Sequence, residues 1–380
     1  PFQLSLSLLN QGSGSTEPSH GRGLKERSKA FSRSPTHDTR NLTPEFYFIY
    51  PPPIPMGAAI NIDWTLATTN LTSVAVLVFF LGFLASRINS DMRIPEPIYQ
   101  MISIYLLFGI GLKGGHGLKS TTFSSFALPA VATIAMGLLI PVIAFFLLNA
   151  IKGLSVFDRG AIAAHYGSTS LVTFSAAMLF LENNVIKVEG FATALLTLLE
   201  IPGIIVGVYL GSKFGHSKVS WNKTLTEVVT GRTVLLLVGG LLIGWVTTHT
   251  GYEKVKPFFI DLQSGFLALF LLHLGWIAGS RWNEIKKVGP KLAIFAIIFP
   301  IFNGFLGVVA GTAAGLSIGG ATILGVLCAS ASYIAAPAAV SVGLPQANAS
   351  LALISSIGVT FPFNLIFGIP LYLQFAEILG

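Results

Sequence analysis

Apolar stretches of about 20 residues recur along the chain from Trp64 onward, separated by short polar connections. A helix of that length rises about 30 Å, which matches the thickness of the hydrocarbon core of a bilayer. The pattern therefore predicts an all-α polytopic membrane protein with ten transmembrane helices. These spans run near residues 64–86, 96–112, 126–150, 159–181, 190–212, 230–249, 258–280, 290–313, 318–343 and 350–376.

The composition agrees with this pattern and excludes a water-soluble enzyme. Hydrophobic residues make up 52% of the chain and charged residues 10%, against roughly 25% charged residues in soluble domains. No phosphate-cradling loop, zinc motif or nucleophile with a suitable base is present in the sequence, so we expect no enzymatic activity, no cofactor and no transition-metal site. The net charge of +7 comes from loop residues and indicates orientation, not nucleic-acid binding.

Loop charges predict how the chain is oriented. The loops after spans one, three, five and seven hold twelve Lys or Arg residues, whereas the opposite face holds five. The positive-inside rule therefore places the twelve in the cytoplasm and both termini outside. The connection at residues 213–232 is predicted to be a basic cytoplasmic loop.

Residues 1–55 are rich in Ser, Pro, Gly and Arg and contain only short apolar runs. We expect them to be a disordered or non-native N-terminal extension outside the fold. Four acidic residues within them argue against a transit peptide. The expected location is therefore the bacterial inner (plasma) membrane, and a chloroplast envelope only if this extension is a genuine transit peptide.

The two halves of the membrane part resemble each other weakly. Residues 166–177 align with residues 328–339 at an offset of 162, and residues 107–115 align with residues 271–279. Five spans per half would force the second copy into the membrane upside down, which gives the inverted repeat common in secondary transporters. The predicted repeats are residues 56–212 and 233–380.

Small and hydroxyl-bearing residues interrupt two spans, at Gly167–Ser170 and at Ser330–Tyr333. A helix can unwind within a bilayer only where protein or a water-filled cavity pairs its backbone. If both spans break and cross, two half-helix N-termini point at one place and suit a small anion, with oxygen ligands beside it for sodium. The alternative is that these runs are close-packing helix interfaces.

Two charged residues stand out within the spans. Glu200 is the only acidic residue deep in a span, so we expect it to be paired, protonated or liganding a cation; a structural hydrogen-bonded carboxyl is the alternative. Lys113 lies between glycines at the end of span two. It either neutralises a passing anion or extends to the membrane interface.

At these positions the sequence resembles the sodium-dependent bicarbonate transporter family, over roughly Met56–Gly380. The resemblance implies ten spans in two inverted repeats, a core domain that moves against a gate domain, and a homotrimer. The motifs that carry it are Ile94–Glu96, Gly111–Gly115, Gly167–Ser170, Glu200–Pro202, Ser330–Ile334 and Gly343–Ala349.

The resemblance further implies sodium-coupled import of bicarbonate by alternating access. Its implied anion site consists of Gly167, Ser168, Thr169, Ser170, Ser330, Ala331 and Ser332. Its implied sodium site consists of Thr169, Ser332, Tyr333 and Glu200. Cyanobacterial members carry Asp where Tyr333 stands here, which leaves the sodium ligands and the substrate open.

The resemblance also implies a PII-like regulatory protein on the cytoplasmic side, although the connection at residues 213–232 is short. Two other functions stay open: a sodium symporter for another small carboxylate, and a non-transporting membrane sensor or scaffold.

Overall fold

The computed structural model describes residues 64–217, 219–285 and 289–380, and the regular secondary structure within these ranges is entirely helical. The predicted N-terminal extension at residues 1–55 lies outside the described residues. The expected all-α fold is therefore confirmed for the part of the chain that the structure describes.

Each predicted span coincides with one helix or with a series of helices. The first half contains α1 (Trp64–Leu71), α2 (Val74–Arg87), α3 (Glu96–Leu118), α4 (Phe123–Leu147), η1 (Leu148–Ala150), α5 (Val156–Gly167), α6 (Leu171–Asn183) and α7 (Ala192–Phe214). The second half contains α8 (Trp221–Thr230), α9 (Arg232–Val246), α10 (His249–Lys256), η2 (Pro257–Asp261), α11 (Gln263–Ser280), α12 (Trp282–Ile285), α13 (Pro290–Ala313), α14 (Ile318–Ala329), α15 (Ala335–Gly343), α16 (Ala349–Ile354), η3 (Ser355–Thr360), α17 (Phe361–Phe363), η4 (Asn364–Gly368) and α18 (Ile369–Leu379).

In the described ranges, six helices are long and apolar enough to cross a membrane, and the pair α8 and α9, bent by 51°, would make a seventh. The other three predicted spans are pairs of short helices: α1 with α2, α5 with α6, and α14 with α15. A helix the length of α5 rises only about 18 Å, which is too short to cross a bilayer alone. The number of ten spans therefore stays a prediction.

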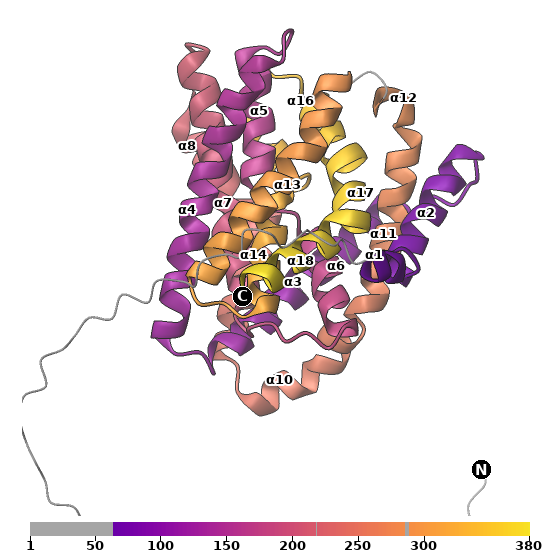
Figure 1. Ribbon diagram of the computed structural model, residues 1–380, viewed down its shortest axis with the longest axis vertical. Coiled ribbons are helices and arrows are strands. Elements are labelled where there is room, and N and C mark those ends of the chain that lie inside the picture. Colours follow the sequence, from indigo (N-terminus) through magenta and orange to yellow (C-terminus); the bar gives the residue numbers. More distant parts are fainter. Residues whose placement is uncertain (1–63, 218, 286–288) are drawn as a thin grey trace, which may run out of the picture. The chain divides into compact units, whose positions relative to one another are not determined.

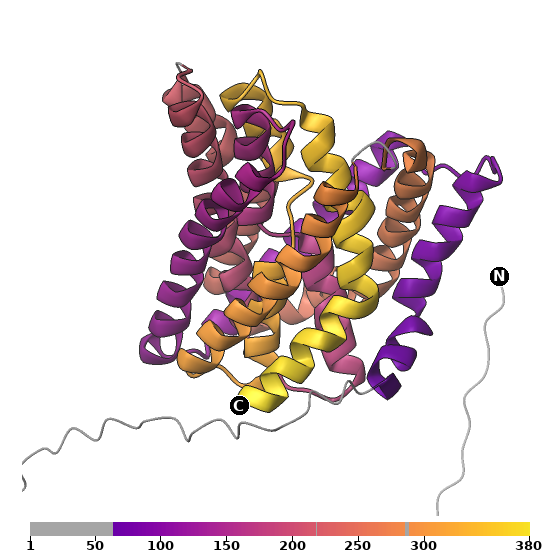
Figure 2. The same cartoon turned by 45° about the horizontal axis from the view of Figure 1, so that its top comes forward.

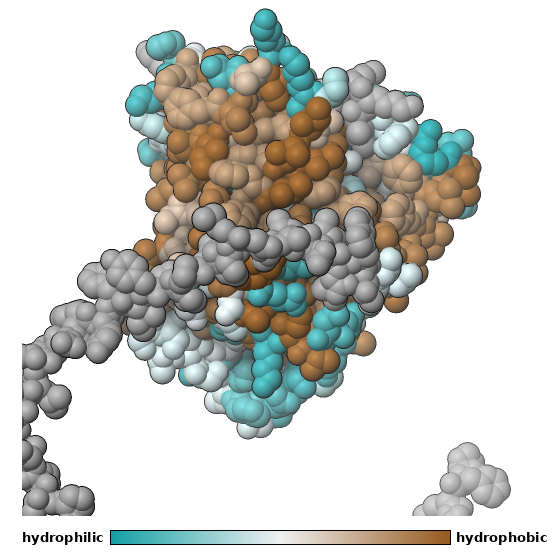
Figure 3. Space-filling view, viewed as in Figure 1, coloured by the Kyte–Doolittle hydropathy of each residue, from teal (hydrophilic) through white to brown (hydrophobic). Residues whose placement is uncertain are grey.

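Large apolar side chains cover much of the outer surface. Exposed examples are Leu77 on α2, Val131 on α4 and Ile298 on α13. The face in Figure 3 shows hydrophobic side chains in a broad band between hydrophilic ends. Soluble proteins rarely expose apolar patches of this extent, so the band fits a lipid environment.

Glycine brings two pairs of helices into backbone contact: α2 with α11, and α3 with α9. A Cβ atom on Gly275 of α11 would lie 2.0 Å from the carbonyl oxygen of Phe79 on α2. A Cβ atom on Gly244 of α9 would lie 2.2 Å from the carbonyl oxygen of Leu112 on α3. Such close approach is typical of small-residue interfaces between membrane helices. Figures 1 and 2 show α2 and α11 side by side.

The remaining long helices form a second group around the two broken spans. Helices α4 and α7 pack on each other and on α5, while α13 and α18 pack on each other and on α14. In Figure 1, α4 lies far from α2, with the broken spans between them.

The connection predicted as a loop at residues 213–232 contains the helix α8. Thr224 and Val228 are buried one turn apart on the same face of this helix. Helix α8 packs against α15, and a Cβ on Gly343 would lie 3.3 Å from the Thr224 side chain. The basic connection predicted as a loop therefore contains a helix, whose amphipathic face packs on the rest of the protein.

Replacement of Gly275 by Ala is expected to lower the stability of the detergent-solubilised protein by about 1–3 kcal/mol, because the new methyl group would overlap the α2 backbone. The measurement is thermal unfolding followed by tryptophan fluorescence. Gly239→Ala is the matched control, since a Cβ on Gly239 meets no atom within 4 Å. The control should be neutral or slightly stabilising, and equal melting temperatures for the two variants would contradict the packing described here.

Candidate functional site

Two spans break in their middle. Helix α5 ends at Gly167 and α6 begins at Leu171, with Ser168 in an extended conformation between them (φ −104°, ψ 172°). Helix α14 ends at Ala329 and α15 begins at Ala335. Helical structure is therefore lost at both positions where the sequence predicts an interruption.

The two broken spans run in opposite directions. At the start of α5, Asp158 accepts a hydrogen bond at 2.7 Å from the backbone N–H of Asn348, which follows α15. At the start of α14, the backbone N–H of Ser317 donates at 2.6 Å to Glu189, which follows α6. Each span therefore begins on the side where the other one ends. Helices α6 and α15 both start at a break, and they run from there in opposite directions.

Ser330 joins the two breaks. Its hydroxyl accepts a hydrogen bond at 2.9 Å from the backbone N–H of Ser170 and lies 3.0 Å from the hydroxyl of Thr169. It also donates at 2.9 Å to the carbonyl oxygen of Leu327. A hydroxyl has one proton, so Thr169 must be the donor in its contact with Ser330.

The second break is fixed by its backbone as well. The N–H of Ser332 donates at 2.8 Å to the carbonyl oxygen of His165, in the last turn of α5. The Ser332 hydroxyl accepts at 3.3 Å from the N–H of Ala336, in the first turn of α15. The Tyr333 hydroxyl is directed towards Ser170 in the first break.

Helix α7 brings a carboxyl group to the first break. Glu200 is only 3% exposed, and its carboxyl lies beside the side chain of Ser168 and the backbone of Thr169. The approach depends on glycine: a Cβ on Gly203 would lie 1.8 Å from the carbonyl oxygen of Gly167. The structure therefore places an intramembrane acid next to a helix end, where a cation would meet oxygen atoms.

The ends of the four half-helices give the site two electrostatic sides. The first turns of α6 and α15 present backbone N–H groups and a partial positive charge, which favour an anion. The last turns of α5 and α14 present carbonyl oxygens and a partial negative charge, which suit a hard cation together with hydroxyl and carboxylate oxygens. No group of three or more His, Cys, Asp or Glu side chains that could hold a metal ion occurs in the described ranges.

All the site residues predicted from the sequence lie in these breaks or against them. Ala331 is buried there but offers only its backbone. Among the described residues, three buried polar atoms at the site have no hydrogen-bond partner of ordinary geometry: Ser168 Oγ, Tyr333 Oη and His165 Nε2. Because buried polar groups are almost always satisfied, these atoms are candidates for ligand contacts.

The last span supplies residues that sequence analysis missed. The amide of Asn364 donates at 2.9 Å to the carbonyl oxygen of Ala329, at the end of α14. The hydroxyl of Thr360 lies 2.6 Å from that of Tyr166 on α5. Both residues occur in or beside π-helical stretches, η3 and η4, which alter the direction of side chains along a helix. The sequence feature that could have identified Asn364 as a site residue is its position in an apolar span, two residues after Pro362.

Comparison with protein families matches residues 74–377 to the Na+-dependent bicarbonate transporter superfamily. No functionally curated protein was found to match the chain. The matched range contains both breaks and Glu200.

Replacement of Ser330 by Ala is expected to destabilise the protein by about 1–3 kcal/mol, because the buried N–H of Ser170 loses its acceptor. Chemical denaturation in detergent measures the change. Ser341→Ala is the control: Ser341 is exposed and bonds only to Ala338 in the same helix, so its loss should change stability by less than about 0.5 kcal/mol. A control variant as unstable as Ser330→Ala would contradict the joining role of Ser330.

Proposed function

Because the chain belongs to the Na+-dependent bicarbonate transporter superfamily, we propose that it is a symporter that imports bicarbonate together with sodium by alternating access. The family consists of transporters, and the chain is accordingly an integral membrane protein that belongs with transporters and not with enzymes. The observation that carries the proposal is the meeting of two oppositely directed helix breaks at Ser330, beside the buried acid Glu200.

The proposed anion site lies between the first turns of α6 and α15. Bicarbonate would accept hydrogen bonds from the amides that precede the first intrahelical bond of each half-helix. The hydroxyl of Ser168, buried and without a partner of ordinary geometry, supports this assignment. The residues assigned to the site are Gly167, Ser168, Thr169, Ser170, Ser330, Ala331 and Ser332.

The proposed sodium site uses Thr169, Ser332, Tyr333 and Glu200. Its oxygen atoms are the type of ligand that a hard cation takes. Tyr333 brings a neutral hydroxyl where the family resemblance implies Asp, so Glu200 supplies the negative charge of the site. One sodium ion would cancel the charge of one bicarbonate ion and lower the cost of holding either within the membrane.

Two observations support an inverted repeat. Helices α5 and α14 begin at residues 156 and 318 and end at residues 167 and 329, each pair 162 residues apart, which is the offset of the sequence repeat. The glycine-mediated pairs are also equivalent, since exchange of the two halves converts the pair α2 with α11 into α9 with α3. We assign α2, α3, α9 and α11 to a gate group, and the helices around the two breaks to a core group that moves against it.

The proposal extends to the surroundings of the protein. A homotrimer in the bacterial inner membrane, with the basic loops in the cytoplasm, is the arrangement that the resemblance and the loop charges support. A PII-like regulatory protein would then meet the cytoplasmic segment that contains α8.

Uptake of radiolabelled bicarbonate into proteoliposomes is expected to fall to the background of empty liposomes when choline replaces sodium outside. The coupling ion is then missing, and an uncompensated anion is costly to hold within the membrane. Equal uptake in choline would exclude sodium coupling. Unlabelled formate or acetate added in excess should leave the uptake unchanged; strong competition would favour a symporter for small carboxylates.

Replacement of Glu200 by Gln is expected to raise the half-saturating sodium concentration at least about tenfold, because the variant keeps the size of the side chain but removes its charge. Initial uptake rates over a range of sodium concentrations measure it. Glu227→Gln is the matched control, since Glu227 is exposed on α8. Unchanged sodium dependence in Glu200→Gln would remove Glu200 from the sodium site.

A further inference from the structure

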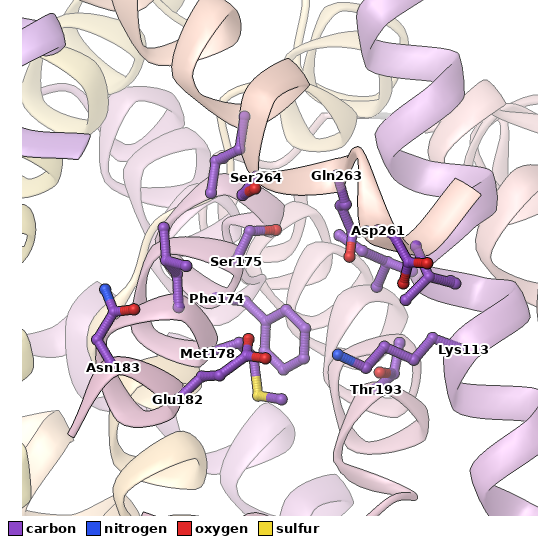
Figure 4. Close-up of a pocket in the computed structure, with 14 residues that line it drawn as sticks. Lys113, Phe174, Ser175, Met178, Glu182, Asn183, Thr193, Asp261, Gln263 and Ser264 are labelled. Atoms are coloured by element: carbon purple, nitrogen blue, oxygen red, sulfur yellow. The ribbon is translucent and has the colours of Figure 1, made fainter. Parts of the chain in front are cut away.

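A cavity of about 430 Å³ lies between α3, α6 and the N-terminal end of α11, and the start of α7 and the end of η2 complete its lining. Helices α3 and α11 belong to the proposed gate group and α6 and α7 to the proposed core group, so the cavity lies where the groups meet. Liquid water occupies about 30 Å³ per molecule, and the cavity is therefore large enough for a hydrated small anion. Figure 4 shows its polar side chains, among them Lys113, Glu182 and Asp261.

Lys113 is the only basic residue among those that line the cavity. It is half-buried on α3, and Figure 4 shows its ammonium group pointing towards the other residues that line the cavity. In the part of the chain that the structure describes, no carboxylate lies within ion-pairing distance of Lys113. Its positive charge is therefore available to a ligand.

The two acidic residues of the cavity are exposed and form no ion pair with Lys113 in the part of the chain that the structure describes. Asp261 is exposed, and one of its carboxylate oxygens lies 3.8 Å from the ammonium nitrogen of Lys256. Glu182 is also exposed, so water and salt screen its charge more strongly than that of the half-buried Lys113. Of the three charged side chains that line the cavity, Lys113 is therefore the one that solvent screens least.

The cavity leads towards the first break. Phe174 and Ser175 line it and belong to the first turns of α6. The backbone N–H of Phe174 donates at 3.0 Å to the carbonyl oxygen of Ser170, so the cavity wall lies about one helical turn, roughly 5 Å along the axis, from the N-terminus of α6. The cavity therefore extends from Lys113 to within about one helical turn of the proposed anion site.

We propose that this cavity is an outer anion site, in which Lys113 collects bicarbonate before it reaches the break between α5 and α6. The inference rests on the proposed function and on the orientation given by the loop charges, which places the end of α6 and the start of α11 outside. Gln263 supports it with a second donor, because its amide nitrogen has no hydrogen-bond partner in the described ranges and the residue lines the cavity. The two ends of an amide are nearly equal in shape, so a rotation directs this nitrogen to a bound anion.

A charge-rescue experiment tests Lys113 directly. The variant Lys113→Cys in proteoliposomes is expected to need about tenfold more bicarbonate for half-maximal uptake at saturating sodium, the order expected for loss of one half-buried charge. Reaction with aminoethyl methanethiosulfonate, which adds a positive group to the thiol, should restore the wild-type value. The negatively charged sulfonatoethyl reagent should not. Cys328, the single native cysteine, is buried, and the unmutated protein treated with both reagents is the reagent control.

The outcomes separate the two proposals. If the unmutated protein shows no sodium-dependent bicarbonate uptake, the proposed function fails. If it shows uptake but Lys113→Cys keeps the wild-type half-saturation, or if both reagents act alike, the outer anion site alone is wrong. Lys187→Met is the control for surface charge, since Lys187 is exposed outside the cavity lining, and it should leave the half-saturation within about twofold.

The variant Glu182→Gln distinguishes an anion site from an ion pair between Lys113 and Glu182 that closes the cavity. If Lys113 acted by pairing with Glu182 to close the cavity, Glu182→Gln and Lys113→Met would change uptake in the same way. An anion site instead predicts that Glu182→Gln leaves the half-saturating bicarbonate concentration unchanged or lowers it, because removal of a nearby negative charge strengthens the field of Lys113. Parallel effects of the two variants would overturn the proposal.

Discussion

Every feature of the site depends on one constraint: a backbone that leaves its helix where no water surrounds it must find other hydrogen-bond partners. Ser330 meets this constraint for the first break, because its hydroxyl accepts from the backbone of Ser170. The carbonyl oxygen of His165 meets it for the second break, by accepting from Ser332. Each break is therefore stabilised by a hydrogen bond to the other broken span. The first N–H groups and the last carbonyl groups of a helix have no partner within it, and the proposed ion sites use such groups at the half-helix ends.

Glycine brings several helices of the described chain into direct backbone contact. Direct backbone contact joins α2 to α11 through Gly275, and α3 to α9 through Gly244. The same device joins α7 to the end of α5 through Gly203. Contacts of this kind leave little room for rearrangement, because a displaced backbone would lose dispersion contacts on both sides. Glycine also joins the two proposed groups: a Cβ on Gly117 of α3 would lie 2.1 Å from the carbonyl oxygen of Gly190, which precedes α7. Motion of the proposed gate group against the proposed core group would have to displace this contact.

The sequence was sufficient to predict the helical fold and the two breaks, because both leave local signals. Hydrophobic length identifies a span, and the small residues around Ser168 and Ser330 weaken a helix wherever they occur. Other features depend on contacts between distant segments and leave weaker signals. Asn364 donates to the end of α14 from within the π-helical stretch η4, and α8 packs against α15. Lys113 shows the same limit: its neighbouring glycines mark a close-packed helix, but only the fold shows that its ammonium group enters a cavity.

The placement of full and partial charges bears on transport. A site that must release its ligand on the other side of the membrane cannot hold it too tightly. Half-helix N-termini carry only partial charges, whereas an ammonium group carries a full one. In the proposed arrangement, Lys113 attracts the anion to the outer cavity, and the partial charges of the half-helix N-termini bind it at the break. Where a bound cation keeps the buried Glu200 ionised, its carboxylate carries a full negative charge, which repels an anion unless that cation lies between them. Binding of bicarbonate next to Glu200 would then require sodium, and this requirement is a physical basis for coupling the two ions.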